Sequence, residues 1–168
     1  VGRLWKNNKI SKSQERFANA VIRNYLENYR SSFKNYNPNN PFVLVATPKG
    51  QKAELGCLVN ACLAVSTGWN PVYLGTDLSS RDICEAAKNS SCSAVIMSIL
   101  FPLNDPTVPL ELERIRNGLG GEFEIIINGK RSSIYSKTCS KIGSHQIYDL
   151  FSLPNALEDI RTDVLRKI

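Results

Sequence analysis

The stretch VATPKGQKAELG, Val45 to Gly56, follows an apolar run and leads into a helical pattern. An apolar run, a loop with glycine and a helix, in that order, are typical of the first βα unit of an open α/β domain. In such domains the loop at the carboxyl end of a strand usually binds the ligand. This loop has glycines and lysines but no histidine, cysteine or aspartate. Its chemistry therefore decides what the domain can hold.

The same alternation of apolar runs and helical patterns continues to the end of the chain. Runs suited to buried strands lie at 42–47, 71–74, 94–99, 123–127 and 147–151. Helical patterns follow them at about 53–67, 79–89, 109–118, 131–142 and 154–166. Five such units predict an α/β fold with a five-stranded, parallel, doubly wound sheet. We expect the flavodoxin-like strand order 2-1-3-4-5, with a ligand crevice at the carboxyl ends of strands 1 and 3.

A long amphipathic helix is predicted before this domain, over residues 10–36. Ser11 and Gln14 form a capping-box pattern at its start, and the polar segment Asn35 to Pro41 ends it. We therefore expect residues 1–40 to be the end of a helical bundle and residues 41–168 to be the α/β domain. The apolar stripe should pack on the domain, on preceding helices or on another subunit. It consists of Phe17, Val21, Ile22, Tyr25, Leu26, Tyr29 and Phe33.

Charge and cysteine content indicate the kind of partner and compartment. The net charge of +6 lies in the first 40 residues, which carry eight Lys and Arg and two Glu. Such a segment suits nucleic acid or an acidic partner, or is an ordinary solvated helix face. The five cysteines form no CxxC pair, which favours free thiols in the reducing cytoplasm. No apolar run approaches the ~20 residues needed to span a bilayer, so we expect no membrane association.

Common catalytic and phosphate-binding uses of this fold do not match the sequence. Gly50 and Gly56 are separated by five residues with no Lys-Ser/Thr after them, which excludes a P-loop, and GxGxxG is absent. A phospho-receiver needs an aspartate at the end of strand 3, where this chain has Met97 and Ser98. The only histidine, His145, comes just before strand 5 and has no predicted nucleophile beside it. We therefore expect that the chain is not an enzyme.

The loop and the later strand ends together resemble the cobalamin-binding domain. The loop from Gly50 to Gly56 resembles the segment that carries the motif Asp/Glu-x-His-x-x-Gly in that family. Ser98 and Leu100 match the family's Ser-x-Leu after strand 3, and Asn128-Gly129 stands where its Gly-Gly follows strand 4.

The segment from Val1 to Ile22 resembles the helical bundle of MerR-type, light-responsive transcription regulators of the CarH/LitR group. In that group a Trp and a Glu cover the upper face of the corrin, and Trp5 and Glu15 match them. The resemblance implies a preceding DNA-binding domain and helices, a homo-oligomer and signalling through DNA occupancy. The chain, which does not begin with Met, would then be a fragment of such a regulator.

The sequence departs from this family where the cobalt ligands should be. The histidine below the cobalt is replaced by Ala53, and Gln51 and Lys52 replace the acidic group that would orient it. Lys6 and Arg16 stand where a histidine above the cobalt would come from. Alanine has no lone pair and protonated Lys and Arg do not readily donate one, so we expect no metal and no tightly bound cobalamin.

Three functions remain. The favoured one is a regulatory interaction module that has lost the cofactor and signals through oligomerisation or a partner protein. The alternative is a sensor that holds cobalamin or another tetrapyrrole by shape and by Trp5. A cobalamin carrier of a methyltransferase or mutase is the weakest, because it needs the histidine. Lys49, Lys52 and the following helical amides favour an anion, so we expect the crevice to be closed by side chains or to hold a small anionic or partner-derived group. The candidate site comprises Trp5, Glu15, Gln51, Lys52, Ala53, Gly56, Ser98, Leu100, Asn128 and Gly129.

Overall fold

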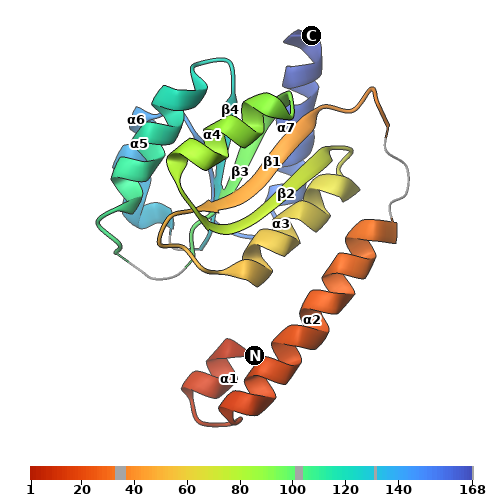
Figure 1. The fold of residues 1–168 in the computed structure, drawn as a ribbon, viewed down its shortest axis with the longest axis vertical. Coiled ribbons are helices and arrows are strands. Elements are labelled where there is room, and N and C mark those ends of the chain that lie inside the picture. Colours follow the sequence, from red (N-terminus) through yellow and green to blue (C-terminus); the bar gives the residue numbers. More distant parts are fainter. Residues whose placement is uncertain (33–36, 101–103, 131, 168) are drawn as a thin grey trace.

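Five parallel strands form one sheet through the middle of the α/β part of the molecule (Figure 1). The computed structural model describes residues 1–32, 37–100, 104–130 and 132–167. The strands pair in the order β2-β1-β3-β4-β5, all in parallel, which confirms the predicted flavodoxin-like fold. Their bounds are β1 (Phe42–Pro48), β2 (Asn70–Leu78), β3 (Cys92–Ser98), β4 (Glu124–Asn128) and β5 (His145–Ile147).

Helices cover both faces of the sheet, because the side chains of its central strands are apolar on both sides. In β1, Leu44 and Ala46 are buried in one core, and Val43 and Val45 are buried in the other. The first core contains α4 (Ser80–Asn89), α5 (Val108–Leu119) and α6 (Ser136–Lys141), and the second contains α3 (Glu54–Ser66) and α7 (Leu153–Lys167). None of the described helices is both long and apolar enough to cross a membrane.

The predicted position of the fifth strand was wrong. The strand spans His145–Ile147, and residues 148–152 form a loop in place of the predicted strand at 147–151. Asp149 causes this turn, because its carboxylate accepts hydrogen bonds from the backbone N–H groups of Phe151 (2.9 Å) and Ser152 (2.8 Å). The helix predicted at 131–142 is likewise broken into a 3-10 turn, η1 (Ser132–Tyr135), and the short α6.

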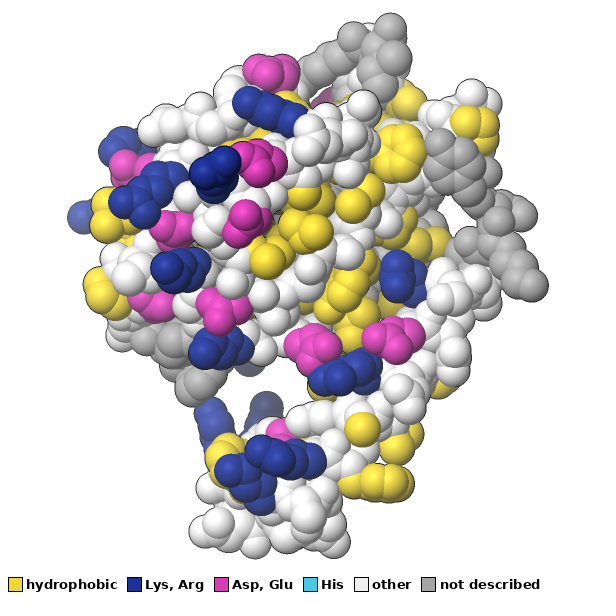
Figure 2. All heavy atoms as spheres, in the orientation of Figure 1, with side chains coloured by type: hydrophobic (Ala, Val, Ile, Leu, Met, Phe, Trp, Pro, Cys, Tyr) yellow, Lys and Arg dark blue, Asp and Glu magenta, His cyan; other side chains and the backbone are white. Residues whose placement is uncertain are grey.

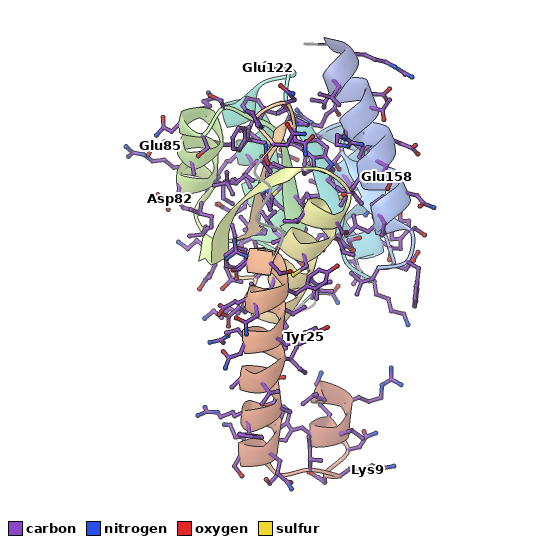
Figure 3. All side chains as sticks on the ribbon, turned by 90° about the vertical axis from the view of Figure 1, so that its right-hand side faces the viewer. Lys9, Tyr25, Asp82, Glu85, Glu122 and Glu158 are labelled. Atoms are coloured by element: carbon purple, nitrogen blue, oxygen red, sulfur yellow. The ribbon has the colours of Figure 1, made fainter. Side chains whose placement is uncertain are left out.

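The N-terminal helical segment extends away from the α/β unit (Figure 1). It consists of a short α1 (Gly2–Lys6) and a long α2 (Lys12–Ser32). The predicted capping box at the start of α2 is confirmed, since the Ser11 N–H donates to Gln14 Oε1 at 2.8 Å and the Gln14 N–H to Ser11 Oγ at 3.2 Å. Figure 3 shows Lys9 at the turn between the two helices, at the end farthest from the sheet.

Helix α2 is attached to α3 through its C-terminal half. The Cys62 thiol donates to the Leu26 carbonyl at 3.3 Å, Arg23 forms an ion pair with Glu54, and the Arg30 guanidinium lies 5.5 Å from the centre of the Tyr73 ring. The cation–π geometry and the half-burial of Ile22 and Leu26 show that this side of the helix contacts the domain.

Three residues of the predicted stripe are exposed and do not pack on the α/β domain, so their packing on preceding helices or on another subunit stays a prediction. Phe17, Val21 and Tyr25 are 73%, 52% and 67% exposed. Part of the stripe meets α3, because Ile22 and Leu26 are half-buried, whereas the three side chains above are exposed. Phe33 lies outside the described residues.

Two substitutions on α2 should therefore differ in effect. We expect Leu26→Ala to lower the free energy of unfolding by about 1–2 kcal/mol, because it removes half-buried apolar surface at α3. Phe17→Ala should change it by less than about 0.5 kcal/mol, as is usual for exposed positions. Thermal unfolding followed by circular dichroism measures both. An equal loss in Phe17→Ala would mean that another subunit covers the stripe in solution.

Candidate functional site

A pocket of about 760 Å³ opens at the carboxyl edge of the sheet. Leu55 and Val59 of α3 form one wall, and Leu150 and Phe151 of the loop before α7 form another. The ends of β3 and β4 contribute to the same pocket. Its volume falls within the range typical of small-molecule sites, which are also mostly apolar. The crevice predicted from the strand order is therefore present, and the side chains of the described residues do not close it.

The structure brings five of the ten predicted site residues to this pocket. They are Gly56, Ser98, Leu100, Asn128 and Gly129. They come together because the carboxyl ends of parallel strands meet at one edge. Ser98 and Asn128 are direct partners in the β3–β4 register. These five residues therefore line one pocket, and their role in binding stays a prediction.

Two glycines permit the close packing around this pocket. A Cβ on Gly56 would overlap the Leu100 side chain and come within 3.0 Å of Ser98 Oγ. A Cβ on Gly129 would overlap the carbonyl oxygen of Ile99, and Gly129 has a φ of +152° that favours glycine. Glycine is therefore required where the turn after β4 meets the Ile99 backbone, whereas at Gly56 the overlap is with the flexible end of Leu100.

Gln51 joins the loop after β1 to the segment after β3. Its side chain is buried, and its Oε1 accepts a hydrogen bond of 3.0 Å from the Leu100 N–H. Its backbone carbonyl accepts from the Thr47 hydroxyl and, at 3.1 Å, from the Asp77 N–H. Gln51 therefore points into the protein and holds the loop, and it does not line the pocket.

Asp77 fills the position where the loop was expected to bind an anion. The Gly50 N–H donates to Asp77 Oδ1 at 2.8 Å, and Lys52 Nζ lies 3.7 Å from Asp77 Oδ2. Asp77 adopts this place with a φ of +62°, which is uncommon for a residue other than glycine. The carboxylate of Asp77, near the end of β2, thus takes the role predicted for a bound anion.

The residues at this edge do not fit a cobalt ligand set. Ala53 precedes the first turn of α3 and offers no donor atom. Burial raises the pKa of the nearby Cys57 thiol to about 12, with a smaller contribution from the charge of Glu54, so no thiolate forms there. His145 lies at the opposite, amino edge, 3.0 Å from Glu124. No cluster of three His, Cys, Asp or Glu occurs in the part of the chain that the structure describes.

Trp5 and Glu15, the two predicted bundle residues, do not line the pocket. Trp5 is 40% exposed on α1, and Glu15 accepts a hydrogen bond of 2.6 Å from Asn19 one turn along its own helix. Figure 2 shows an open space between the α1–α2 segment and the α/β unit, with Lys and Arg side chains at its border. The structure thus leaves these two residues apart from the other predicted positions.

Several pocket residues were missed by the sequence analysis. Leu55 and Val59 flank Gly56 at helical spacing, so a search along one face of the predicted helix would have found them. Residues 148–151 were assigned to a buried strand, which concealed their place at the pocket's mouth. Nothing in the sequence pattern marked Lys130, which follows Gly129 in the same rim.

Neither protein-family models nor curated proteins match the chain. Among solved structures it is similar to a cobalamin-binding protein from Desulfitobacterium hafniense (15% identity, 96% of this chain, 75% of that chain, TM-score 0.59). It is also similar to the monomethylamine corrinoid protein of Methanosarcina barkeri (14% identity, 95% of this chain, 76% of that chain, TM-score 0.70). A third match is the methanol:cobalamin methyltransferase complex MtaBC from Methanosarcina barkeri (14% identity, 99% of this chain, 62% of that chain, TM-score 0.61). At this identity the likeness shows a shared fold.

The packing at Gly129 can be tested by substitution. We expect Gly129→Ala to lower the free energy of unfolding by about 1–3 kcal/mol, because the new methyl group overlaps the Ile99 carbonyl and strains φ. Gly121→Ala is the matched control, since no atom lies within 4 Å of its added Cβ. Thermal melts of both variants measure the difference. Equal stability of the two would contradict the close approach of these loops.

Proposed function

We propose that the chain is the effector part of a MerR-type transcription regulator, and that its α/β domain binds a small organic ligand in the carboxyl-edge pocket. The observation that carries this proposal is the pocket itself. Its floor is built by residues that match a ligand-binding family, while the loop beside it provides no metal ligand. The open pocket therefore favours a ligand-sensing module over the interaction module that the sequence alone favoured.

The pocket's ionisable groups favour binding over catalysis. Hydrogen bonds from the backbone N–H and the hydroxyl of Ser152 hold the pKa of the Asp149 carboxyl below its ordinary value. Asp149 is thereby committed to the turn that starts α7 and is a weak base. Lys130 contributes a cation at the rim. No nucleophile paired with a base occurs among the residues that line this pocket.

The ligand is held by apolar contact and hydrogen bonds. Solved proteins of this fold include ones described as cobalamin-binding or corrinoid proteins, so a corrinoid is one ligand to test. Ala53 gives no bond to cobalt, and a corrinoid would be retained through surface contact alone. We therefore expect it to dissociate readily.

Helix α3 supports a regulatory role because it contacts both the ligand pocket and α2. Leu55 and Val59 line the pocket, while Glu54 and Cys62 of the same helix hold α2. A ligand that shifts α3 would shift α2 with it. In the proposed regulator this movement would change the oligomeric state and so the occupancy of DNA.

One observation favours the interaction module as a second candidate. The exposed stripe of Phe17, Val21 and Tyr25 is an apolar surface on a basic helical segment. Such a surface is typical of a contact with another protein. In that case a partner protein would switch the regulator without a pocket ligand.

The absence of a cobalt bond gives a spectroscopic prediction. After incubation with adenosylcobalamin in the dark and desalting, we expect the wild-type chain to retain little corrin absorbance. Ala53→His supplies an imidazole at the start of α3 and should lower the Kd at least about tenfold. Ala53→Ser is the matched control without an imidazole. Stoichiometric retention by the wild type would contradict weak, unligated binding.

The regulatory role is tested with the intact regulator and its promoter DNA. We expect a protein-free small-molecule extract of the host cells to change oligomeric state and DNA occupancy, because its ligand enters the pocket. Val59→Trp narrows the pocket beside α3 and should weaken the response, whereas Leu165→Trp, which places the same side chain on exposed α7, should preserve it. Sizing chromatography and a DNA-binding assay measure both. A response that requires a protein fraction and survives Val59→Trp would favour the interaction module.

A further inference from the structure

We propose that Asn128 recognises the hydrogen-bonding edge of a flat heteroaromatic ligand, and that the buried Asn60 is the positioning residue that orients it. This inference rests on the proposed function, because it concerns the ligand of the same pocket. The hydrogen bond between these two asparagines could not be predicted from the sequence, because the residues are 68 positions apart.

Asn128 presents an amide at the floor of a mostly apolar pocket. It is the last residue of β4, only 4% exposed, and lies beside Ser98 in the sheet register. Its Nδ2 donates a hydrogen bond of 2.7 Å to Asn60 Oδ1. Among the described residues Asn60 is the only side-chain partner of this amide. The remaining amide edge of Asn128 is therefore left for the pocket.

Asn60 is buried in α3, one turn after Gly56, with no exposed surface. Its own Nδ2 is enclosed and has no partner within the described ranges. Asn60 therefore keeps one buried polar atom without a partner among the described residues. If the nitrogen and oxygen of both amides are exchanged, that atom is an accepting oxygen in place of a donating nitrogen. An enclosed group of this kind lowers stability, and an apolar residue of similar size would avoid the loss. Folding alone therefore does not account for Asn60, whereas orienting Asn128 does.

The shape of the pocket determines the class of ligand. Leu55 and Val59 on one side and Leu150 and Phe151 on the other offer apolar surface to the faces of a ring. Of the polar residues that line the pocket, Asn128 and Ser98 are register partners at the ends of β4 and β3 and would meet its edge. An asparagine amide pairs with an adjacent donor and acceptor, as it does with the edge of adenine. A flat ring with such an edge satisfies the walls and the floor at once.

Adenine and indole test this inference, because both are flat bicyclic rings and only adenine carries the paired donor and acceptor. NMR titrations of the whole chain should give a Kd for adenine about tenfold or more below that for indole. Asn60→Leu should reduce this preference to less than about threefold by weakening adenine, while the melting temperature stays the same or rises. Asn60→Asp keeps an accepting oxygen for Asn128 and should retain the preference.

The outcomes separate this inference from the proposed function. If both rings bind wild-type protein equally, or if Asn60→Leu lowers the melting temperature and weakens both rings alike, Asn60 is only structural and the inference is wrong. The pocket would still bind ligands, so the proposed function would stand. If neither adenine nor indole binds, and Val59→Trp does not change the response to the small-molecule extract, then the polar floor and the ligand pocket are both wrong.

Discussion

The hydrogen bond from the Leu100 N–H to the buried Gln51 side chain, 3.0 Å long, holds the carboxyl edge of the sheet together. At this edge the chain leaves β1 toward α3 on one face and leaves β3 toward α5 on the other, which opens a crevice in any sheet of this order. The bond ties the two diverging loops at the crevice's root. The close approach of Gly56 to Leu100 and Ser98 then sets the distance between α3 and the sheet. The pocket is thus built by the protein's own contacts.

This constraint explains how the loop keeps its form without the residues of a cobalamin loop. Gln51 turns inward, and Asp77 supplies a carboxylate to the Gly50 N–H and the Lys52 amine. Protein groups therefore satisfy the polar atoms that would otherwise need a ligand or ion. A loop ordered in this way is preorganised before any ligand binds, which favours affinity from apolar contact and hydrogen bonds alone. The proposed ligand-sensing role requires this property, because Ala53 contributes no bond.

The parts of this structure that sequence predicts are those set by local pattern. Strands β1, β3 and β4 read as apolar runs because both of their faces are buried, and the flavodoxin-like order followed from the alternation with helices. The strand at residues 147–151 was misplaced because a single carboxylate, Asp149, turns the chain. The stripe on α2 was correctly identified as apolar, but amphipathicity does not indicate which surface covers it. The Asn60–Asn128 pair was missed because it joins residues that are distant in sequence.

Under the proposed function, Leu100 is where ligand binding and loop structure meet. Its side chain lies against Gly56 and reaches the pocket, while its backbone N–H holds Gln51. A ligand that fills the pocket presses on this side chain and on α3 from the same side. Helix α3 is rigid over its 13 residues, so a displacement at Leu55 and Val59 reaches Cys62, which holds α2. Because Glu54 and Cys62 of α3 contact α2, a ligand-driven shift of α3 would move the N-terminal segment with it.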